Sequence, residues 1–212
     1  MNILKPQKIL FNNLTKIDDF VEEFEKDDEI ENISIEDYKK ENIELLNITI
    51  RKAIINNTEL MNSNLEKSTF MDIEFNNCNF SNTYFDNCSF IRCEFNNCKL
   101  TGGNFIECSL CDVIYIDTNM LYANLTMNSM KSLLFKNTLL RNINFQENII
   151  KNIFFREADL TQARFFKTSL NGVDFSDSKI EGIAVSIEDI KGAIINEIQA
   201  IDLMYLLGVK IK

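Results

Sequence analysis

The chain has 212 residues, a formal net charge of −10 and no histidine. Without histidine, the sequence excludes a His-based general base, a Ser-His-Asp triad and histidine metal ligands. No apolar run reaches the 18 or more residues of a membrane-spanning helix, so we expect a single-domain protein with no membrane association.

Residues 1–44 form an acidic extension with 13 acidic and 6 basic side chains. The first six residues lack the apolar block of a secretory signal, and six cysteines without such a signal indicate free thiols, so we expect a cytoplasmic location. Apolar residues at helical spacing within 14–31 predict an N-terminal cap. These residues are Leu14, Ile17, Phe20, Val21 and Phe24. Residues 32–44 are interpreted as a transition, in which Ile33 and Ile35 could belong to an early irregular coil.

From Leu45 to Ile180 every fifth residue is large and apolar, over 28 consecutive positions. Neither the 3.6-residue period of a helix nor the two-residue period of a strand explains this interval, so it is read as an internal repeat. A second column, two residues ahead of the first, is mostly small. One large and one small inward position in every five residues predicts a chain that turns a corner every five residues.

This pattern resembles that of the pentapeptide-repeat proteins, which fold as a right-handed quadrilateral β-helix. The resemblance implies an all-β solenoid of about seven coils over residues 45–185, with four repeats in each coil. Residues twenty apart should then stack, which predicts two ladders of core side chains on opposite faces. One ladder comprises Phe75, Phe95, Tyr115, Phe135, Phe155 and Phe175, and the other comprises Leu65, Phe85, Phe105, Leu125, Phe145 and Phe165.

Residues 186–212 are predicted to form a C-terminal cap and dimerisation helix. Asn196 and Gln199 stand in capping-box positions, and a helix over about 197–207 would end at Gly208. The helix is apolar on most sides, so one side can cover the last coil and another needs a partner. We expect a two-fold homodimer. The expected contacts are Ile201, Met204, Tyr205, Leu207, Val209 and Ile211.

The tail also resembles a narrower branch, the Qnr-type quinolone-resistance proteins, in its loop-less Gram-positive members. The resemblance rests on the stretch 189–194, on Gln199-Ala200 and on 206–209. It implies dimerisation through the C-terminal end and binding to DNA gyrase or topoisomerase IV, with possible protection from quinolones or toxins. The outward loops of the plasmid-borne members are absent, because the five-residue register contains no insertion.

The family's rod is held to imitate B-DNA, and the charge part of that expectation can be counted. Residues 45–212 hold 19 acidic and 16 basic side chains, a balance of only −3. A length of B-DNA matching seven coils carries roughly 20 negative charges. The repeat body therefore falls far short of electrostatic mimicry, and no direct binding to nucleic acid is expected.

An apolar stripe on the outside of the coils is a possible partner surface. Ile114, Leu134 and Phe154 are twenty residues apart and should stack outward, with other apolar side chains nearby. These neighbours are Ile91, Cys111 and Ile116. Either a separate partner binds this stripe or the N-terminal extension folds back over it.

We expect no catalytic, cofactor or metal site. Five of the six cysteines fall in the small inward column, where cysteine acts as a compact apolar side chain. They are Cys78, Cys88, Cys93, Cys98 and Cys108, whereas Cys111 falls outward as a possible reactive thiol. The sequence thus predicts a non-enzymatic, Qnr-like binding protein; the alternative is an interaction or structural rod that does not bind a topoisomerase.

Overall fold

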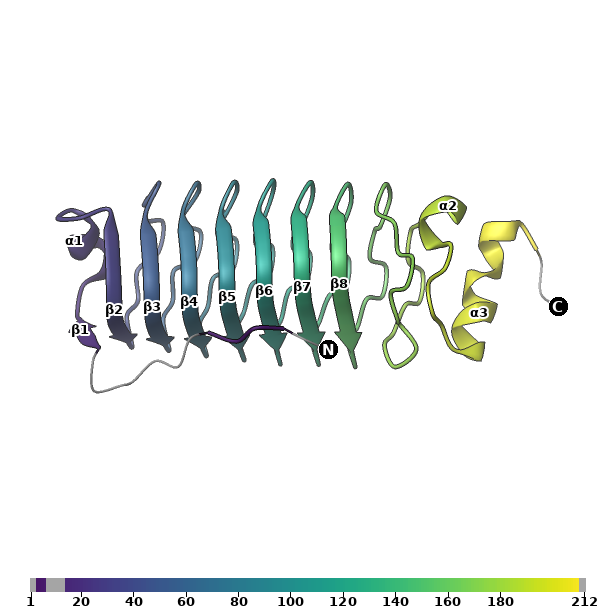
Figure 1. Cartoon of the computed structure of the whole chain (residues 1–212), viewed down its shortest axis with the longest axis horizontal. Coiled ribbons are helices and arrows are strands. Elements are labelled where there is room, and N and C mark those ends of the chain that lie inside the picture. The colour runs from purple at the N-terminus through teal and green to yellow at the C-terminus, as the bar shows by residue number, and fades with distance from the viewer. Residues whose placement is uncertain (1–2, 7–13, 210–212) are drawn as a thin grey trace.

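The computed structural model describes residues 3–6 and 14–209, and shows a straight rod of stacked coils (Figure 1). Eight strands form one parallel sheet in chain order along the rod. The strands are β1 (Thr15–Ile17), β2 (Glu29–Glu36), β3 (Thr49–Asn56), β4 (Thr69–Asn76), β5 (Ser89–Asn96), β6 (Ser109–Ile116), β7 (Ser129–Lys136) and β8 (Ile149–Arg156). The helices are α1 (Phe20–Phe24), α2 (Ile187–Ile190) and α3 (Glu197–Leu203), followed by the 3-10 helix η2 (Met204–Leu207).

From β2 to β8, paired residues on neighbouring strands are twenty positions apart. Phe70 is the register partner of Phe90, and Phe95 that of Tyr115. Isolated parallel bridges such as Asn64 to Tyr84 continue the same offset on the remaining faces. The predicted right-handed quadrilateral β-helix of about seven coils is confirmed.

The core is the predicted column of large side chains, with the aromatic rings stacked along the rod. In the first ladder, Tyr115 lies 5.0 Å from both Phe95 and Phe135 between ring centroids. In the opposite ladder, the rings of Phe85 and Phe105 stack at 4.9 Å. The repeat therefore encodes a dry interior with no space for a ligand between the stacked rings.

The asparagine content follows from the corners of the coils. The second residue after almost every large inward residue adopts a left-handed conformation, with φ of 55° at Asn77 and 51° at Asn97. Asparagine tolerates this conformation better than most residues with a side chain. These side chains also bond from coil to coil: the amide of Asn97 donates to Asn77 Oδ1 over 2.8 Å. Asparagine thus serves the fold at the corners.

The N-terminal region differs from the expectation of a helical cap over 14–31. Only α1 is helical, capped by the Asp19 side chain, and its buried Phe20 and Phe24 cover the first coil. The early coil expected to be irregular is instead the regular strand β2, which pairs with β3 from Glu29 onward. The parallel ladder therefore starts before Leu45. The five-residue rhythm is lost at Lys40, which is exposed, while Tyr38 is buried in the column that is mostly small elsewhere.

The C-terminal end matches the expected cap. Asn196 and Gln199 form the capping box of α3, and Gly208 ends η2 with a φ of 67°. Buried Gln199 also donates from Nε2 to the carbonyl oxygens of Phe175 and Ser178, at 2.8 and 2.6 Å. These bonds satisfy backbone acceptors of the last coil, as a capped solenoid requires. Among the residues that the structure describes, no helix is long and apolar enough to cross a membrane.

Candidate interaction surface

The outward stripe runs along one column of the sheet. Ile114 of β6 pairs with Leu134 of β7, which pairs with Phe154 of β8. The same column carries Glu74 and Glu94 on the two preceding strands. From β4 to β8 the column therefore changes from acidic to apolar.

The two ends of this stripe differ in their access to solvent. Ile114 was expected to be exposed, but only 4 % of its surface remains accessible, whereas Leu134 and Phe154 are half-buried. The reason lies in residues 3–6, which cross the sheet at this level (Figure 1). The backbone N–H of Leu4 donates to Asp112 Oδ1 at 3.2 Å, and Lys5 Nζ lies 3.3 Å from Glu94 Oε2. Residues 3–6 thus cover the stripe over β5 and β6, and the residues that the structure describes leave it open over β7 and β8.

Basic side chains border the open part of the stripe. Lys131 pairs with Lys151 on one side of it, and Lys136 pairs with Arg156 on the other. The three lysines are exposed and Arg156 is half-buried. This part of the surface is therefore apolar along its centre and positive along both edges, in a chain whose net charge is −10.

The remaining residues of the predicted surface lie beside the covered part. Ile91 and Cys111 are paired neighbours on β5 and β6, and Ile116 lies next to Lys136; all three hydrophobic side chains are half-buried. Burial, and then the nearby negative charge of Asp112, raise the pKa of the Cys111 thiol. A raised pKa leaves less of the reactive thiolate at neutral pH than in a free cysteine.

The other five cysteines serve the core. Their thiols donate to carbonyl groups one coil away, as from Cys108 to Phe85 O at 3.0 Å and from Cys88 to Leu65 O at 3.1 Å. Burial raises the pKa of Cys88 and of Cys93 to about 12. Within the described ranges, no three His, Cys, Asp or Glu side chains converge as metal ligands would.

The C-terminal helix presents apolar residues to solvent. Ile198, Ile201 and Tyr205, at helical spacing, are 73, 57 and 50 % exposed, and Val209 beyond the helix is also exposed. Tyr205 also donates its hydroxyl to the carbonyl of Ile183 in the last coil. Met204 is half-buried. Of the other predicted dimer contacts, the side chain of Leu207 and all of Ile211 lie outside what the structure describes.

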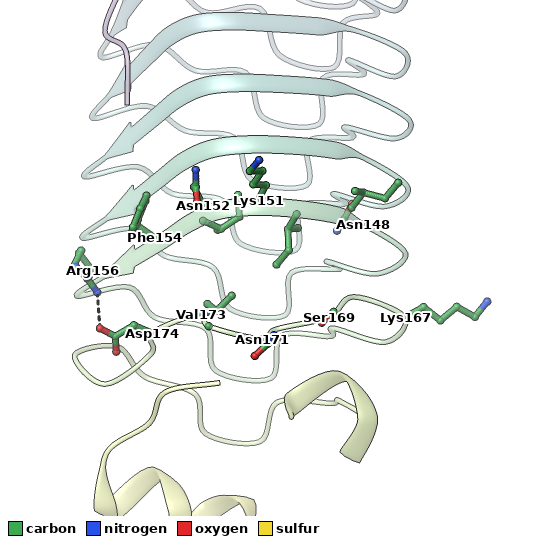
Figure 2. A pocket seen from close by; sticks show the side chains of 14 residues that line it. Asn148, Lys151, Asn152, Phe154, Arg156, Lys167, Ser169, Asn171, Val173 and Asp174 are labelled. Atoms are coloured by element: carbon green, nitrogen blue, oxygen red, sulfur yellow. Dashed lines mark hydrogen bonds and ion pairs between the residues drawn. The ribbon is translucent and has the colours of Figure 1, made fainter. Parts of the chain in front are cut away.

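A groove that the sequence did not predict lies beside the open stripe (Figure 2). It has a volume of about 790 Å³ and lies between β8 and residues 167–174 of the following coil. Figure 2 shows Arg156 and Asp174 joined at one end of the groove and Lys167 extending from the other. The one signal in the sequence is the turn pair Asn171-Gly172, which interrupts the succession of strands.

Comparisons with known proteins agree with this architecture. The family model for the pentapeptide repeat region matches residues 68–145 and 88–165. No curated protein matches the chain in sequence. Among solved structures, a trypsin-treated variant of QnrB1, a plasmid-mediated fluoroquinolone resistance protein, is 19 % identical with a TM-score of 0.56, covering 85 % of this chain and 90 % of that one.

A second trypsin-treated QnrB1 variant is 18 % identical with a TM-score of 0.55, over 84 % of this chain and 91 % of that one. HetL, a pentapeptide-repeat protein involved in heterocyst differentiation regulation in the cyanobacterium Nostoc sp. strain PCC 7120, is 16 % identical with a TM-score of 0.35, over 79 and 91 % of the two chains. At these identities the likeness concerns the fold.

Proposed function

We propose that this chain is a pentapeptide-repeat protein of the non-enzymatic, Qnr-like kind that engages DNA gyrase or topoisomerase IV. The observation that carries the proposal is the surface over β7 and β8, where Leu134 and Phe154 form an apolar centre between basic borders. Exposed apolar patches on an otherwise polar surface are typical of protein interaction sites. The fold shared with a fluoroquinolone resistance protein makes a type II topoisomerase the first partner to test.

The mode of binding differs from imitation of DNA. The repeat body is close to neutral, and its β7–β8 surface is positive, opposite in sign to a phosphate backbone. We infer that the rod binds its partner through apolar contact, with the lysines selecting acidic groups around it. Charged side chains around an apolar contact speed association and fix the orientation of the partner more than they add affinity.

The test is a gyrase supercoiling assay with and without ciprofloxacin. We expect micromolar protein to change the supercoiling rate or to restore it in the presence of the drug. The variant Leu134→Asp with Phe154→Asp should lose the effect, because two desolvated carboxylates would face the partner. Tyr122→Asp, at an exposed position away from the stripe, is the matched control. No inhibition and no protection by the wild type would refute the topoisomerase proposal.

We further propose that the protein is a homodimer joined through α3. The exposed side chains of Ile198, Ile201 and Tyr205 support this, since the last coil leaves them uncovered. Most closed homo-oligomers are two-fold dimers with self-complementary patches. Sedimentation should give about twice the chain mass of 24.6 kDa. Ile198→Glu with Ile201→Lys should give a folded monomer, whereas the control Ile149→Glu should stay dimeric; a monomeric wild type at tens of micromolar would remove this proposal.

The alternative is a cytoplasmic interaction rod that does not bind a topoisomerase. Its support is the same β7–β8 surface, which does not by itself specify the partner. Affinity capture from the native cell extract, with the Leu134→Asp and Phe154→Asp variant as the control, separates the two. Gyrase subunits as the main wild-type-specific partners would contradict this alternative.

A further inference from the structure

The parallel sheet ends at β8, and the chain that follows turns away from it. No strand follows β8 in the sheet. Residues 170–173 close a tight turn, in which Val173 N–H donates to Leu170 O at 3.0 Å and Gly172 has a φ of 78°. The corresponding residue of β8, Asn152, has a similar φ of 56°, so the bond from Val173 to Leu170, and not the glycine conformation, distinguishes this turn. In β8 the corresponding residues run on as a strand.

Residues 170–173 form backbone hydrogen bonds with the coil that follows them. Leu170 N–H donates to Asp189 O at 2.8 Å, and Gly172 N–H donates to Gly192 O at 2.9 Å. Consequently β8 keeps one edge facing the groove, with Arg156 and Asp174, 3.4 Å apart, spanning one end. An edge strand that presents its backbone groups to open space is a template for another strand.

The groove combines an apolar lining with positive charge. Ile153 and Val173 are 5 % exposed within it, and Phe154 is half-buried on its wall. Its rim carries Lys151, Arg156 and Lys167, of which Arg156 is paired with Asp174 and Asp177, and Lys167 is paired with Glu147. Lys151 is exposed and has no ion-pair partner among the residues the structure describes. The groove therefore selects for an acidic ligand with some apolar side chains.

We propose that this groove binds an extended acidic peptide segment of a partner protein, which adds as a strand along the free edge of β8. Backbone hydrogen bonds would supply affinity, and alternate side chains of the peptide would meet the lysines or the apolar wall. A volume of about 790 Å³ lies within the usual size of a ligand site. The chain's own residues 7–13 contain no acidic side chain, so they do not supply the complementary charge. The site goes beyond the proposed function, since it requires no topoisomerase.

The test is fluorescence anisotropy with the full chain and a labelled eight-residue peptide in which glutamate alternates with valine. We expect saturable binding at micromolar concentrations. A peptide in which lysine replaces glutamate should bind at least tenfold more weakly. A peptide with N-methyl groups on alternate amides, which cannot donate those bonds, should also bind at least tenfold more weakly.

Three variants localise the site. Ser169→Trp places a large side chain in the groove at an exposed position and should abolish binding. Lys151→Gln should weaken binding about threefold, the size expected for an exposed ion pair. Lys179→Gln removes an exposed lysine on another face and should have no effect.

Circular dichroism should show the native strand content in each variant before binding is measured. No binding of the glutamate peptide at millimolar concentration would overturn the proposal. Binding of the N-methylated peptide as tight as that of the unmodified glutamate peptide would also overturn the proposal. So would a single-stranded DNA oligonucleotide that competes as well as the unlabelled glutamate peptide, because neither result depends on strand pairing with β8. Supercoiling activity lost in Leu134→Asp with Phe154→Asp but retained in Ser169→Trp would separate the groove from the topoisomerase surface.

Discussion

Tyr115 lies in the middle of the aromatic ladder, and replacing it with phenylalanine should stabilise the protein. Its ring is fully buried and stacks on Phe95 and on Phe135, each at 5.0 Å. Within the part of the chain that the structure describes, its hydroxyl has no hydrogen-bond partner. Burial raises the pKa of this hydroxyl, so it stays neutral at all ordinary pH values.

The magnitude follows from the unpaired hydroxyl. A buried polar group without a hydrogen bond costs about 1–3 kcal/mol relative to solvent, and Tyr115→Phe removes that cost while keeping both stacked contacts. A small void in place of the oxygen offsets part of the gain, so we expect the free energy of unfolding to rise by about 1 kcal/mol. For a chain of this size, that corresponds to an increase of roughly 2–4 °C in Tm.

The assay is urea unfolding followed by circular dichroism, together with a thermal melt. Tyr122→Phe is the control. Tyr122 is 65 % exposed, so removing its hydroxyl should change the free energy of unfolding little. A Tyr115→Phe variant that is less stable than the wild type by 1 kcal/mol or more would refute the reasoning. It would mean that the hydroxyl forms a bond in the folded protein.

Three further predictions concern the core, an ion pair and the thiols. Ala158→Leu should lower the unfolding free energy by about 1–3 kcal/mol, because Ala158 is 1 % exposed in the small inward column; urea unfolding measures this, and no loss would contradict the tight packing of that column. The pKa of Asp159 is lowered: burial raises it, but bonds from Arg141 and Thr161 outweigh burial. The stability this provides is complete above the unfolded pKa of about 3.9 and is lost as the pH falls through the lower folded value, so Asp159→Asn should be less stable than the wild type at pH 6 and the difference should shrink by pH 2. Iodoacetamide followed by mass spectrometry should modify Cys111 slowly and first, and a chain lacking residues 1–6 should react faster there; equal rates at all six cysteines would contradict the burial of the other five.

The sequence predicts the fold because the fold is nearly one-dimensional. Phe70, for example, contacts Phe75 five residues later and Phe90 twenty residues later, so the five-residue rhythm contains both the coil and the stacking. The capping box at Asn196 and Gln199 was also predictable, since it depends on residues close in the sequence.

Features that depend on distant or irregular backbone were not predictable. The contact between Leu4 and Asp112 joins residues 108 positions apart, and no rhythm links them. Lys40 is exposed at a position of the large inward column, yet the parallel pairing of β2 with β3 continues the ladder although the sequence pattern stops. The groove beside β8 adjoins the tight turn of residues 170–173, which a repeat of constant length hides.

The central claim is that the surface over β7 and β8 binds a type II topoisomerase. It is tested most directly by biolayer interferometry of the immobilised protein with purified gyrase and topoisomerase IV. We predict micromolar or tighter binding to at least one of them, a loss of at least tenfold in Leu134→Asp with Phe154→Asp, and no change in Tyr122→Asp. Absence of binding to both enzymes, or binding that the double variant leaves unchanged, would contradict the claim.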